Sequence, residues 1–431
     1  MNSKKMCMIR MINKNLKIES NSFRGTQENN TSAHDMLQMI HGMLTPKHIL
    51  VRRKKQVSLK EALSRVVAEE IRARYDSPLF DESLRDGFAV AEDVVVGRHE
   101  QITFELVGQT GAGDQLDTLL GKDETWKVMT GGVVPDNCER IIPQEWCIVD
   151  GSRITIPSHR LSGPRFIKER GREFKKNSLI AEVGEVISPA SIVRIADCGW
   201  SNVSVYRRPR ICFCCTGKEL VEGDPGKAQK ISSNQYLLSA LLEQNGCLST
   251  DYGIVGDEVQ AVDEFFQYSL EEDFDLILTT GGTGGGDFDL VESGFLNAGG
   301  TLICNSIDMR PGQSLIVGEK DGTLYVGLPG PPRAVHTVFL EIIVPLLLTM
   351  KGVKEDSSPQ IIAIATEDIV MKTRGALLIK GGVLTFKEGF CQVRMAGKDE
   401  HPNCNMLIGP GRDVIRSGEK VEVHLWDIKR M

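Results

Sequence analysis

An apolar strand opens directly into a glycine-rich loop at residues 276–289, which read Leu276-Ile277-Leu278-Thr279-Thr280-Gly281-Gly282-Thr283-Gly284-Gly285-Gly286-Asp287-Phe288-Asp289. Glycines lack a Cβ, so such a loop can adopt unusual dihedral angles and let backbone N–H groups approach phosphate oxygens. Open α/β sheets bind ligands at the carboxyl ends of their strands, which is where this loop lies. The stretch therefore predicts an anion cradle on an α/β sheet, although a glycine-rich loop can also be only a flexible connection.

Apolar strands and helical stretches alternate on both sides of this loop. In chain order these segments are Ile211 to Cys215, Asn234 to Asn245, Leu276 to Thr280, Tyr325 to Leu328, and Arg333 to Met350. Strands and helices that alternate at this spacing indicate a parallel sheet with both faces covered. We therefore expect a three-layer α/β/α sheet domain at residues 208–354.

The rest of the chain follows other patterns, so the expected fold class is α/β multidomain. Apolar residues recur at helical spacing from His34 and again from Leu59, which predicts two helices before the first turn. The other expected parts are a flexible extension at 1–33, a helical linker and dimerisation body at 34–76 and 166–207, a β-rich insertion domain at 77–165, and a small C-terminal β-barrel or sandwich at 355–431.

The composition is ordinary for a soluble enzyme. The 431 residues are 41% hydrophobic and 25% charged, and the formal net charge of -7 argues against a nucleic-acid-binding surface. The strongest apolar run, Val338 to Met350, is shorter than a membrane span and contains Glu341 and Pro345, so it predicts a buried helix. The first 30 residues show no apolar core of a signal peptide. A cytoplasmic protein is expected.

Eleven cysteines, an odd number, show no zinc-ligand spacing, and this fits a reduced compartment. Cys212, Cys214 and Cys215 lie in one apolar run. We interpret them as small hydrophobic residues of a buried strand rather than as a metal or redox site.

Acidic residues follow neighbouring expected strands. Glu219 comes after Thr216-Gly217-Lys218, Asp257 comes after Ile254-Val255-Gly256, and Asp289 ends the glycine loop. Hard divalent cations prefer carboxylate oxygens beside substrate phosphates, so this arrangement suits a magnesium ion. Each acid, taken singly, could equally be a solvated loop residue.

Two further features adjoin the expected sheet. The turn Pro329-Gly330-Pro331-Pro332 precedes an expected helix and would direct that helix's free N–H groups above the sheet. It could equally be a turn that only ends the strand and starts the helix. Arg310 is a fixed cation that could hold an oxyanion or could be a solvated surface charge.

Several motifs together make the chain similar to one family, the molybdopterin molybdenumtransferases, which include the bacterial MoeA proteins and the E domain of gephyrin. The motifs occur in the family's order from about Ser58 to Gly352. They are Ser77 to Val90 with its Asp86-Gly87-Phe88-Ala89, Met129 to Pro135, Pro143-Gln144-Glu145, Arg208-Pro209-Arg210, Thr216 to Leu220, Ser233-Asn234, and the loop Gly281 to Asp289.

The resemblance implies a homodimer of elongated subunits with four subdomains, and a sheet domain similar to the MoaB and MogA proteins. It implies that Asp86 and Thr130 of the insertion face the partner subunit's site, that Glu219 and Asp289 hold magnesium, and that Asp257 assists them. Arg310 would belong to the molybdate pocket. The residues implied to bind the pterin phosphate or adenylate are Thr216, Gly217, Ser233, Asn234, Gly281, Gly282, Thr283, Gly284, Gly285, Gly286, Pro329 and Gly330.

The implied reaction is magnesium-dependent insertion of molybdate into adenylylated molybdopterin with release of AMP. Small molecules are then the substrates, and a separate molybdopterin adenylyltransferase is a possible partner, with neither nucleic acid nor a membrane involved. Magnesium would neutralise phosphate charge, and cationic side chains would hold molybdate near the dithiolene sulfurs.

Departures from the family pattern cluster in the expected oxyanion pocket. Gln313 stands where the family usually has a lysine, Pro331 replaces an asparagine, Ala334 replaces a nearby serine, and Gly284 replaces the serine of the glycine loop. A pocket with fewer cations and hydroxyl groups should hold a dianion more weakly. The sequence therefore leaves open a non-catalytic carrier or sensor of molybdopterin, and also a nucleotide-cleaving enzyme that shares only the sheet domain.

Overall fold

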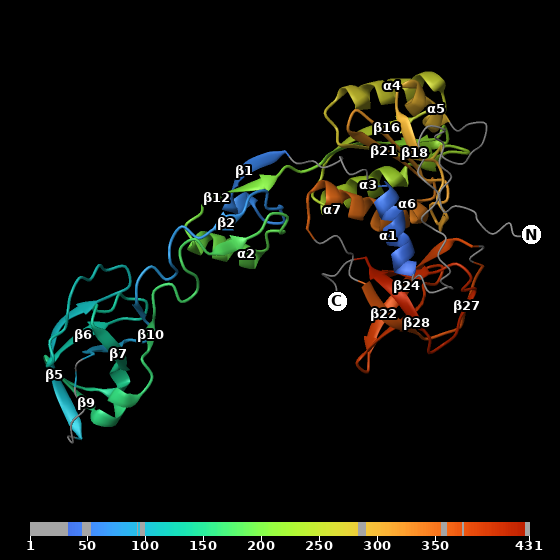
Figure 1. The fold of residues 1–431 in the computed structure, drawn as a ribbon. Coiled ribbons are helices and arrows are strands. Elements are labelled where there is room, and N and C mark those ends of the chain that lie inside the picture. Colours follow the sequence, from blue (N-terminus) through green and yellow to red (C-terminus); the bar gives the residue numbers. More distant parts are fainter. Residues whose placement is uncertain are drawn as a thin grey trace, which may run out of the picture. The chain divides into compact units, whose positions relative to one another are not determined.

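The chain divides into two compact units. The computed structural model describes residues 33–44, 53–92, 94, 100–282, 290–354, 360–372 and 375–426. The larger unit comprises Met1–Lys55 and Tyr206–Met431, and the insertion unit comprises Gln56–Val205. The larger unit contains an α/β sheet and a β-barrel, and the insertion unit contains a separate six-stranded sheet (Figure 1).

The α/β sheet of the larger unit has six strands in the order β16-β13-β17-β21-β20-β18. The first four are parallel, whereas β20 and β18 are antiparallel to their neighbours. The bounds are β13 (Arg210–Thr216), β16 (Leu248–Val255), β17 (Leu276–Thr280), β18 (Thr301–Cys304), β20 (Ile316–Lys320) and β21 (Thr323–Leu328). The expected parallel sheet is confirmed, with an antiparallel edge that the sequence pattern did not predict.

Helices cover both faces of this sheet, because side chains of successive strand residues point to opposite faces. Ile211 and Phe213 pack in one core cluster with α1 (Ala33–Leu44), α3 (Ser233–Gln244), α6 (Pro332–Val338), the π-helical turn η4 (Phe339–Ile343) and α7 (Val344–Met350). Cys212 and Cys214 pack in the other with α4 (Val259–Glu271) and α5 (Leu290–Asn297). Figure 1 shows α4 and α5 above the sheet, and α1, α3, α6 and α7 below it. The three-layer expectation is confirmed.

The C-terminal strands close into a barrel. Its five strands are β22 (Gln360–Ala365), β24 (Leu377–Lys387), β25 (Phe390–Met395), β26 (Cys404–Ile408) and β28 (Lys420–Leu425). They run in the order β24-β25-β22-β28-β26, and β26 pairs back with β24. Two short strands, β23 (Ile369–Val370) and β27 (Val414–Ile415), pair with each other. The strand β19 (Met309–Arg310) lies parallel to β24 and so connects the α/β part with the barrel.

A buried polar network joins α1, η4 and the barrel. The carboxylate of Glu341, 2% exposed, accepts a hydrogen bond from Asn405 Nδ2 at 2.7 Å and lies 2.7 Å from His424 Nδ1. The other ring nitrogen of His424 lies 3.3 Å from His34 Nδ1, and His41 contacts the backbone carbonyl of Glu341. Because burial makes each unpaired polar group costly, this network holds the three elements together.

The insertion unit has a sheet in the order β7-β4-β6-β5-β9-β8. Its strands are β4 (Gly87–Ala91), β5 (Gln101–Thr110), β6 (Glu124–Val128), β7 (Cys138–Pro143), β8 (Ile148–Asp150) and β9 (Arg153–Pro157). The remainder pairs β1 (Lys54–Ser58) with β12 (Asn202–Tyr206), β2 (Ile71–Arg72) with β11 (Leu179–Ala181), and β3 (Glu82–Ser83) with β10 (Ile167–Lys168), and it contains α2 (Pro189–Asp197).

The prediction of a second helix near Leu59 is wrong. Only a 3-10 turn, Leu59–Glu61, forms there, and Ser64 has a positive φ of 60°. Val66 and Val67 instead form β-bridges with Val186 and Val205, so the apolar spacing reflects burial against distant strands rather than a helical face.

Two interpretations of apolar segments agree with the structure. Cys212, Cys214 and Cys215 are fully buried in β13, and burial raises the pKa of the Cys212 thiol to about 12. Among the described residues, Pro332–Met350 is the one helical stretch long and apolar enough to cross a membrane. It is 61% buried and packs in the core against the α/β sheet, as a core helix does.

Candidate functional site

A cleft of about 620 Å³ opens at the carboxyl ends of β13, β17 and β21. Its lining also includes the start of α3 and the two short parallel strands β14 (Leu220–Val221) and β15 (Lys230–Ile231). The lining residues are Thr216, Gly217, Glu219, Leu220, Lys230, Ile231, Ser232, Ser233, Asn234, Asp257, Thr280, Gly281, Gly282, Gly330, Pro331 and Pro332. Parallel strands end on one edge of a sheet, and this brings residues from distant parts of the sequence together.

Glycine is required where the backbone turns at this edge. Gly281 has φ +88°, and a Cβ there would lie 2.7 Å from the carbonyl oxygen of Thr216. Gly282 has φ +62°, and a Cβ there would lie 2.5 Å from a methyl group of Val291. Both positions therefore exclude a side chain for conformational and steric reasons. The remainder of the predicted cradle, Thr283 to Asp289, lies outside the described residues.

Asn234 ties the cleft's elements together. Its Nδ2 donates to the carbonyl oxygen of Gly330 at 2.8 Å and lies 3.3 Å from Thr280 Oγ1. The hydroxyl of Thr216 donates to the carbonyl oxygen of Thr280 at 3.1 Å. Since these bonds connect α3 with the ends of β13, β17 and β21, they set the width of the cleft before any ligand binds.

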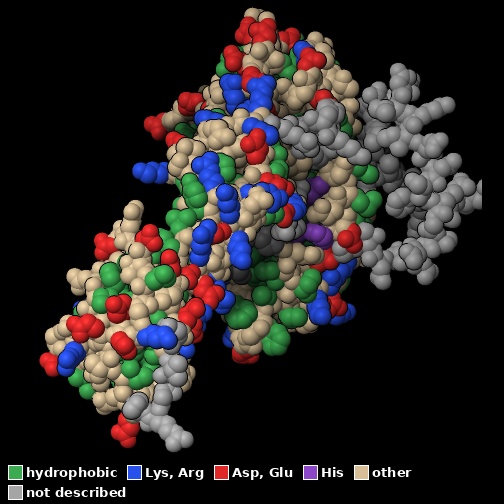
Figure 2. Space-filling view, turned by 60° about the vertical axis from the view of Figure 1, so that its left-hand side comes forward, with side chains coloured by type: hydrophobic (Ala, Val, Ile, Leu, Met, Phe, Trp, Pro, Cys, Tyr) green, Lys and Arg blue, Asp and Glu red, His purple; other side chains and the backbone are tan. Residues whose placement is uncertain are grey.

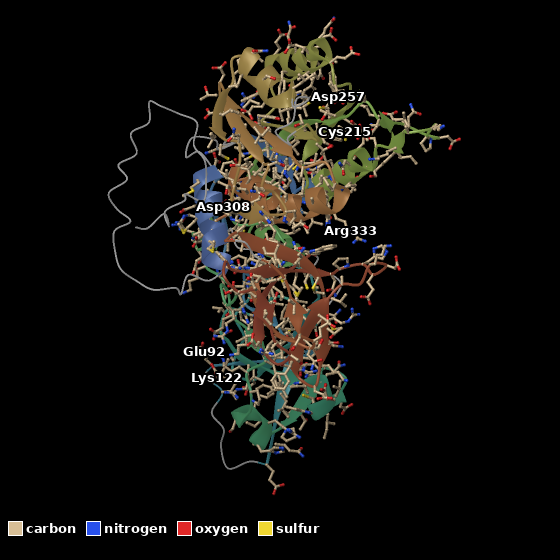
Figure 3. All side chains as sticks on the ribbon, turned by 90° about the vertical axis from the view of Figure 1, so that its right-hand side faces the viewer. Glu92, Lys122, Cys215, Asp257, Asp308 and Arg333 are labelled. Atoms are coloured by element: carbon tan, nitrogen blue, oxygen red, sulfur yellow. The ribbon has the colours of Figure 1, made fainter. Side chains whose placement is uncertain are left out.

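Of the two predicted magnesium ligands, Glu219 lines this cleft, together with Asp257, which was predicted to assist them. Glu219 follows β13, and Asp257 follows β16 and accepts a hydrogen bond from the backbone N–H of Lys218 at 3.2 Å. Figure 3 shows Asp257 above Cys215 in the α/β part. The described part of the chain contains no cluster of three or more His, Cys, Asp or Glu with metal-ligand geometry. Two carboxylates beside a phosphate-sized space fit magnesium, which completes its shell with water and phosphate oxygens.

Asp86 and Thr130 form a pair in the insertion unit. Asp86 Oδ1 accepts hydrogen bonds from both the backbone N–H and the hydroxyl of Thr130, each at 2.7 Å. These bonds, the backbone one first, hold the pKa of the Asp86 carboxyl below its ordinary 3.8. The residues are 44 positions apart in sequence, so the pairing depends on the turn after β6 returning to the start of β4.

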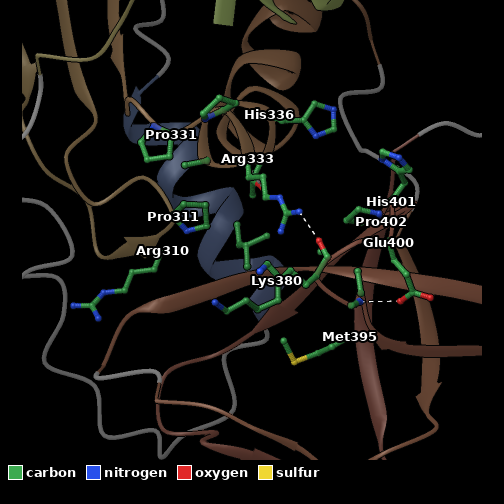
Figure 4. Close-up of a pocket in the computed structure, with 18 of the residues that line it drawn as sticks. Arg310, Pro311, Pro331, Arg333, His336, Lys380, Met395, Glu400, His401 and Pro402 are labelled. Atoms are coloured by element: carbon green, nitrogen blue, oxygen red, sulfur yellow. Dashed lines mark hydrogen bonds between the residues drawn. The ribbon is translucent and has the colours of Figure 1, made fainter. Parts of the chain in front are cut away.

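A second pocket, of about 1300 Å³, lies between α6 and the barrel (Figure 4). Pro331 and Pro332 line both this pocket and the cleft, so the two spaces adjoin at one turn. Arg310 lines its margin, and Figure 4 shows the guanidinium directed away from Arg333 and Lys380. Figure 2 shows both acidic and basic side chains on the visible surface. Binding of an anion therefore depends on the local cations of a pocket rather than on the charge of the surface as a whole.

Comparison with known proteins agrees with the motifs. Residues 31–199 match the MoeA N-terminal region (domain I and II), and residues 212–349 match a probable molybdopterin binding domain. A molybdopterin molybdenumtransferase of Staphylococcus aureus is 31% identical over 383 residues, which cover 86% of this chain and 90% of that protein. The chain belongs to the molybdopterin molybdenumtransferase family. A Staphylococcus epidermidis member is 29% identical over 384 residues.

Solved structures of molybdopterin molybdenumtransferase relatives have the same fold. The molybdopterin biosynthesis MoeA protein from Pyrococcus horikosii superposes with a TM-score of 0.76 over 92% of this chain and 99% of that one, at 22% identity. A molybdopterin biosynthesis MoeA protein from Pyrococcus horikoshii OT3 gives a TM-score of 0.74 over 92% of this chain and 100% of that one, at 21% identity. The expectation of an enzyme of molybdenum-cofactor biosynthesis is confirmed at the level of the family. Since the matched region includes the insertion unit, an enzyme sharing only the sheet domain is not supported.

Some of the residues predicted for a molybdopterin molybdenumtransferase site line the cleft, and others do not or lie outside the described residues. Those that line the cleft are Thr216, Gly217, Glu219, Ser233, Asn234, Asp257, Gly281, Gly282 and Gly330. Pro329 is buried behind the turn rather than lining it. Thr283, Gly284, Gly285, Gly286 and Asp289 lie outside the described residues. Their roles in binding or catalysis stay predictions.

Several site residues of this molybdopterin molybdenumtransferase were not foreseen. Lys230 adds a cation to the cleft, and Arg333, Lys372, Lys380 and Lys398 line the second pocket. Lys230 lies on β15 and Lys380 on β24, whereas Lys372 and Lys398 lie between strands, so no single spacing pattern marks these lysines in the sequence. Of the departures from the family pattern, Ala334 and Pro331 line the pocket and Gln313 does not.

Proposed function

We propose that this enzyme inserts molybdate into adenylylated molybdopterin, in a magnesium-dependent reaction that releases AMP. The observation that carries the proposal is the cleft itself, in which two carboxylates, Glu219 and Asp257, share one rim with the glycine turn Gly281–Gly282. Backbone N–H groups and a lysine favour a phosphate there, and the carboxylates favour a divalent cation beside it.

Each group has a defined role in the proposal. Glu219 and Asp289 would hold magnesium, with Asp257 assisting, and the ion would supply neutralisation of the phosphate charge. Thr216, Gly217, Ser233 and the glycine loop position the phosphate, while Asn234 keeps the turn at Gly330 in place. Lys230 compensates the excess negative charge of two carboxylates and a phosphate.

The Asp86–Thr130 pair supports a site completed by a second subunit. Its carboxylate is held ionised and oriented by two hydrogen bonds, yet it lies in the insertion unit and lines neither the cleft nor the second pocket. A homodimer in which this pair closes the partner's site accounts for both facts. A cytoplasmic location and supply of the adenylylated substrate by a separate adenylyltransferase complete the proposal.

The test is incubation with adenylylated molybdopterin, magnesium and molybdate, with AMP and pterin-bound molybdenum both measured. The wild type should release AMP, and Asp289→Ala, Glu219→Gln and Asp257→Asn should each reduce the rate at a fixed magnesium concentration. Asp251→Asn is the matched control, because Asp251 lies on β16 but not in the cleft. Release that is unaffected in Asp289→Ala and Glu219→Gln would remove the proposed metal site.

A carrier or sensor of molybdopterin is the second candidate. It is favoured by the replacement of the family's serine by Ala334 in the second pocket and by the direction of the Arg310 guanidinium away from Arg333 and Lys380. Tight molybdopterin binding without AMP release in the same assay would favour this candidate over the transferase.

A further inference from the structure

Arg333 lies at the point where the two spaces meet. It follows the turn Gly330–Pro332, whose prolines line both the cleft and the second pocket, and it stands in the first turn of α6. A group bound by Arg333 would therefore lie next to a ligand in the cleft. Figure 3 places Arg333 below the α/β sheet, on the side that faces the barrel strands.

The guanidinium of Arg333 is oriented across the pocket. Its Nη2 donates to the backbone carbonyl of Lys398 at 2.9 Å, which is its one hydrogen bond recorded among the described residues. Most of the N–H donors of the guanidinium are then left for a ligand. Figure 4 shows this side chain between α6 and the barrel, in the pocket that Lys380 also lines, whereas the guanidinium of Arg310 is directed away from Arg333.

The pocket around Arg333 carries an excess of positive charge. Lys372, Lys380 and Lys398 line it together with two acids, Asp399 and Glu400. Glu400 is held by both Nη atoms of Arg394 at 2.6 Å, so its charge is neutralised within that pair. Apolar lining residues, among them Trp426 and Met395, reduce the screening of these charges by water.

We propose that Arg333, together with Lys380, holds the tetrahedral oxyanion substrate, molybdate or tungstate, in place of Arg310. The proposal rests on the proposed function and names the cations that bind the molybdate of that reaction. A guanidinium offers a planar fork that binds two oxygens of one anion, which a single lysine cannot do. Arg333 thereby supplies a cation beside Ala334, in the pocket that Gln313 does not line.

The experiment measures binding of molybdate alone by equilibrium dialysis, so that it does not depend on turnover. Arg333→Gln should weaken binding about tenfold or more, the scale of one charge-assisted hydrogen bond, and Lys380→Gln should also weaken it. Arg333→Lys should fall between wild type and Arg333→Gln. Arg416→Gln is the matched control, since Arg416 is an exposed arginine of the barrel outside the pocket, and it should bind as wild type does.

The outcomes separate this inference from the proposed function. If Arg333→Gln bound molybdate with unchanged affinity while the wild type released AMP, the role of Arg333 would be overturned. The proposed function would not be affected by that result. A wild type that binds no molybdate would also overturn it. Arg333-dependent molybdate binding in a chain that never releases AMP would support the site while contradicting the transferase. Arg333 is exposed, so its variants should fold, and an unchanged melting temperature checks this.

Discussion

At the residue scale, the hydrogen bonds from Thr130 explain why Asp86 stays ionised. Because the folded pKa lies below 3.8, the pair stabilises the folded state above about pH 4, and this contribution is lost as the pH falls through the folded pKa. Thr130→Val removes the hydroxyl bond and keeps the backbone bond, which is the larger cause. We expect the Asp86 pKa to rise in this variant but to stay below 3.8, as measured by carboxyl-carbon NMR. A pKa at or above 3.8, or one unchanged, would contradict the geometry.

At the scale of elements, Glu341 connects η4 with β26 and β28. Glu341→Ala leaves Asn405 and His424 buried with lost partners, so we expect it to cost roughly 2–5 kcal/mol of unfolding free energy. Urea denaturation followed by circular dichroism measures this. Glu341→Gln keeps an acceptor of the same shape and should cost less. The exposed pair Arg412–Glu419 is the comparison, since breaking it in Glu419→Gln should leave the midpoint unchanged.

The attachment of α1 should depend on pH through His41. Burial is the largest cause that lowers the His41 pKa below 6.5, so the unfolded chain binds a proton more readily than the folded one. Stability should therefore fall as the pH decreases below about 6.5, and the loss should continue until the folded pKa is passed. Burial lowers the His336 pKa in the same direction.

His41→Gln tests this dependence. The variant has no titrating ring, so its melting temperature should change less between about pH 7.5 and about pH 5.5 than that of the wild type. His336→Gln should remove a separate part of the dependence. An equal pH dependence in wild type and His41→Gln would show that the proton is taken up elsewhere.

At the scale of the whole molecule, the two units have separate hydrophobic cores. No core cluster of described residues contains members of both units. Trp126, Trp146 and Trp200 lie in the insertion unit, and Trp426 is the one tryptophan of the larger unit. Replacing the first three by phenylalanine leaves a reporter of the larger unit alone.

We expect the fluorescence of Trp426 in this triple variant to give one urea midpoint for unfolding. The wild-type fluorescence, to which the three tryptophans of the insertion unit contribute most, should give a different midpoint. Circular dichroism, which follows both units, should then show two transitions. Coincident midpoints by all three measurements would mean that the units unfold as one.

The sequence by itself determined what depends on neighbours along the chain. Short apolar runs defined β13, β17 and β21, and the glycines at 281 and 282 marked the turn where a Cβ does not fit. Since parallel strands end at one edge, the placement of Glu219 and Asp257 in one cleft also followed from order along the chain. Local geometry and burial periodicity suffice for such features.

Only the tertiary structure decided what depends on contacts between distant segments. Val66 and Val67 belong to an apolar pattern with helical spacing, but they form β-bridges with Val186 and Val205. The same apolar residues can be buried either on one face of a helix or against distant segments, and the spacing alone does not distinguish the two. The direction of Arg310, the placement of Arg333 and Lys380 in one pocket, and the pairing of Asp86 with Thr130 leave no periodic trace in the sequence. Each results from strand closure or turn geometry, which many residues set together.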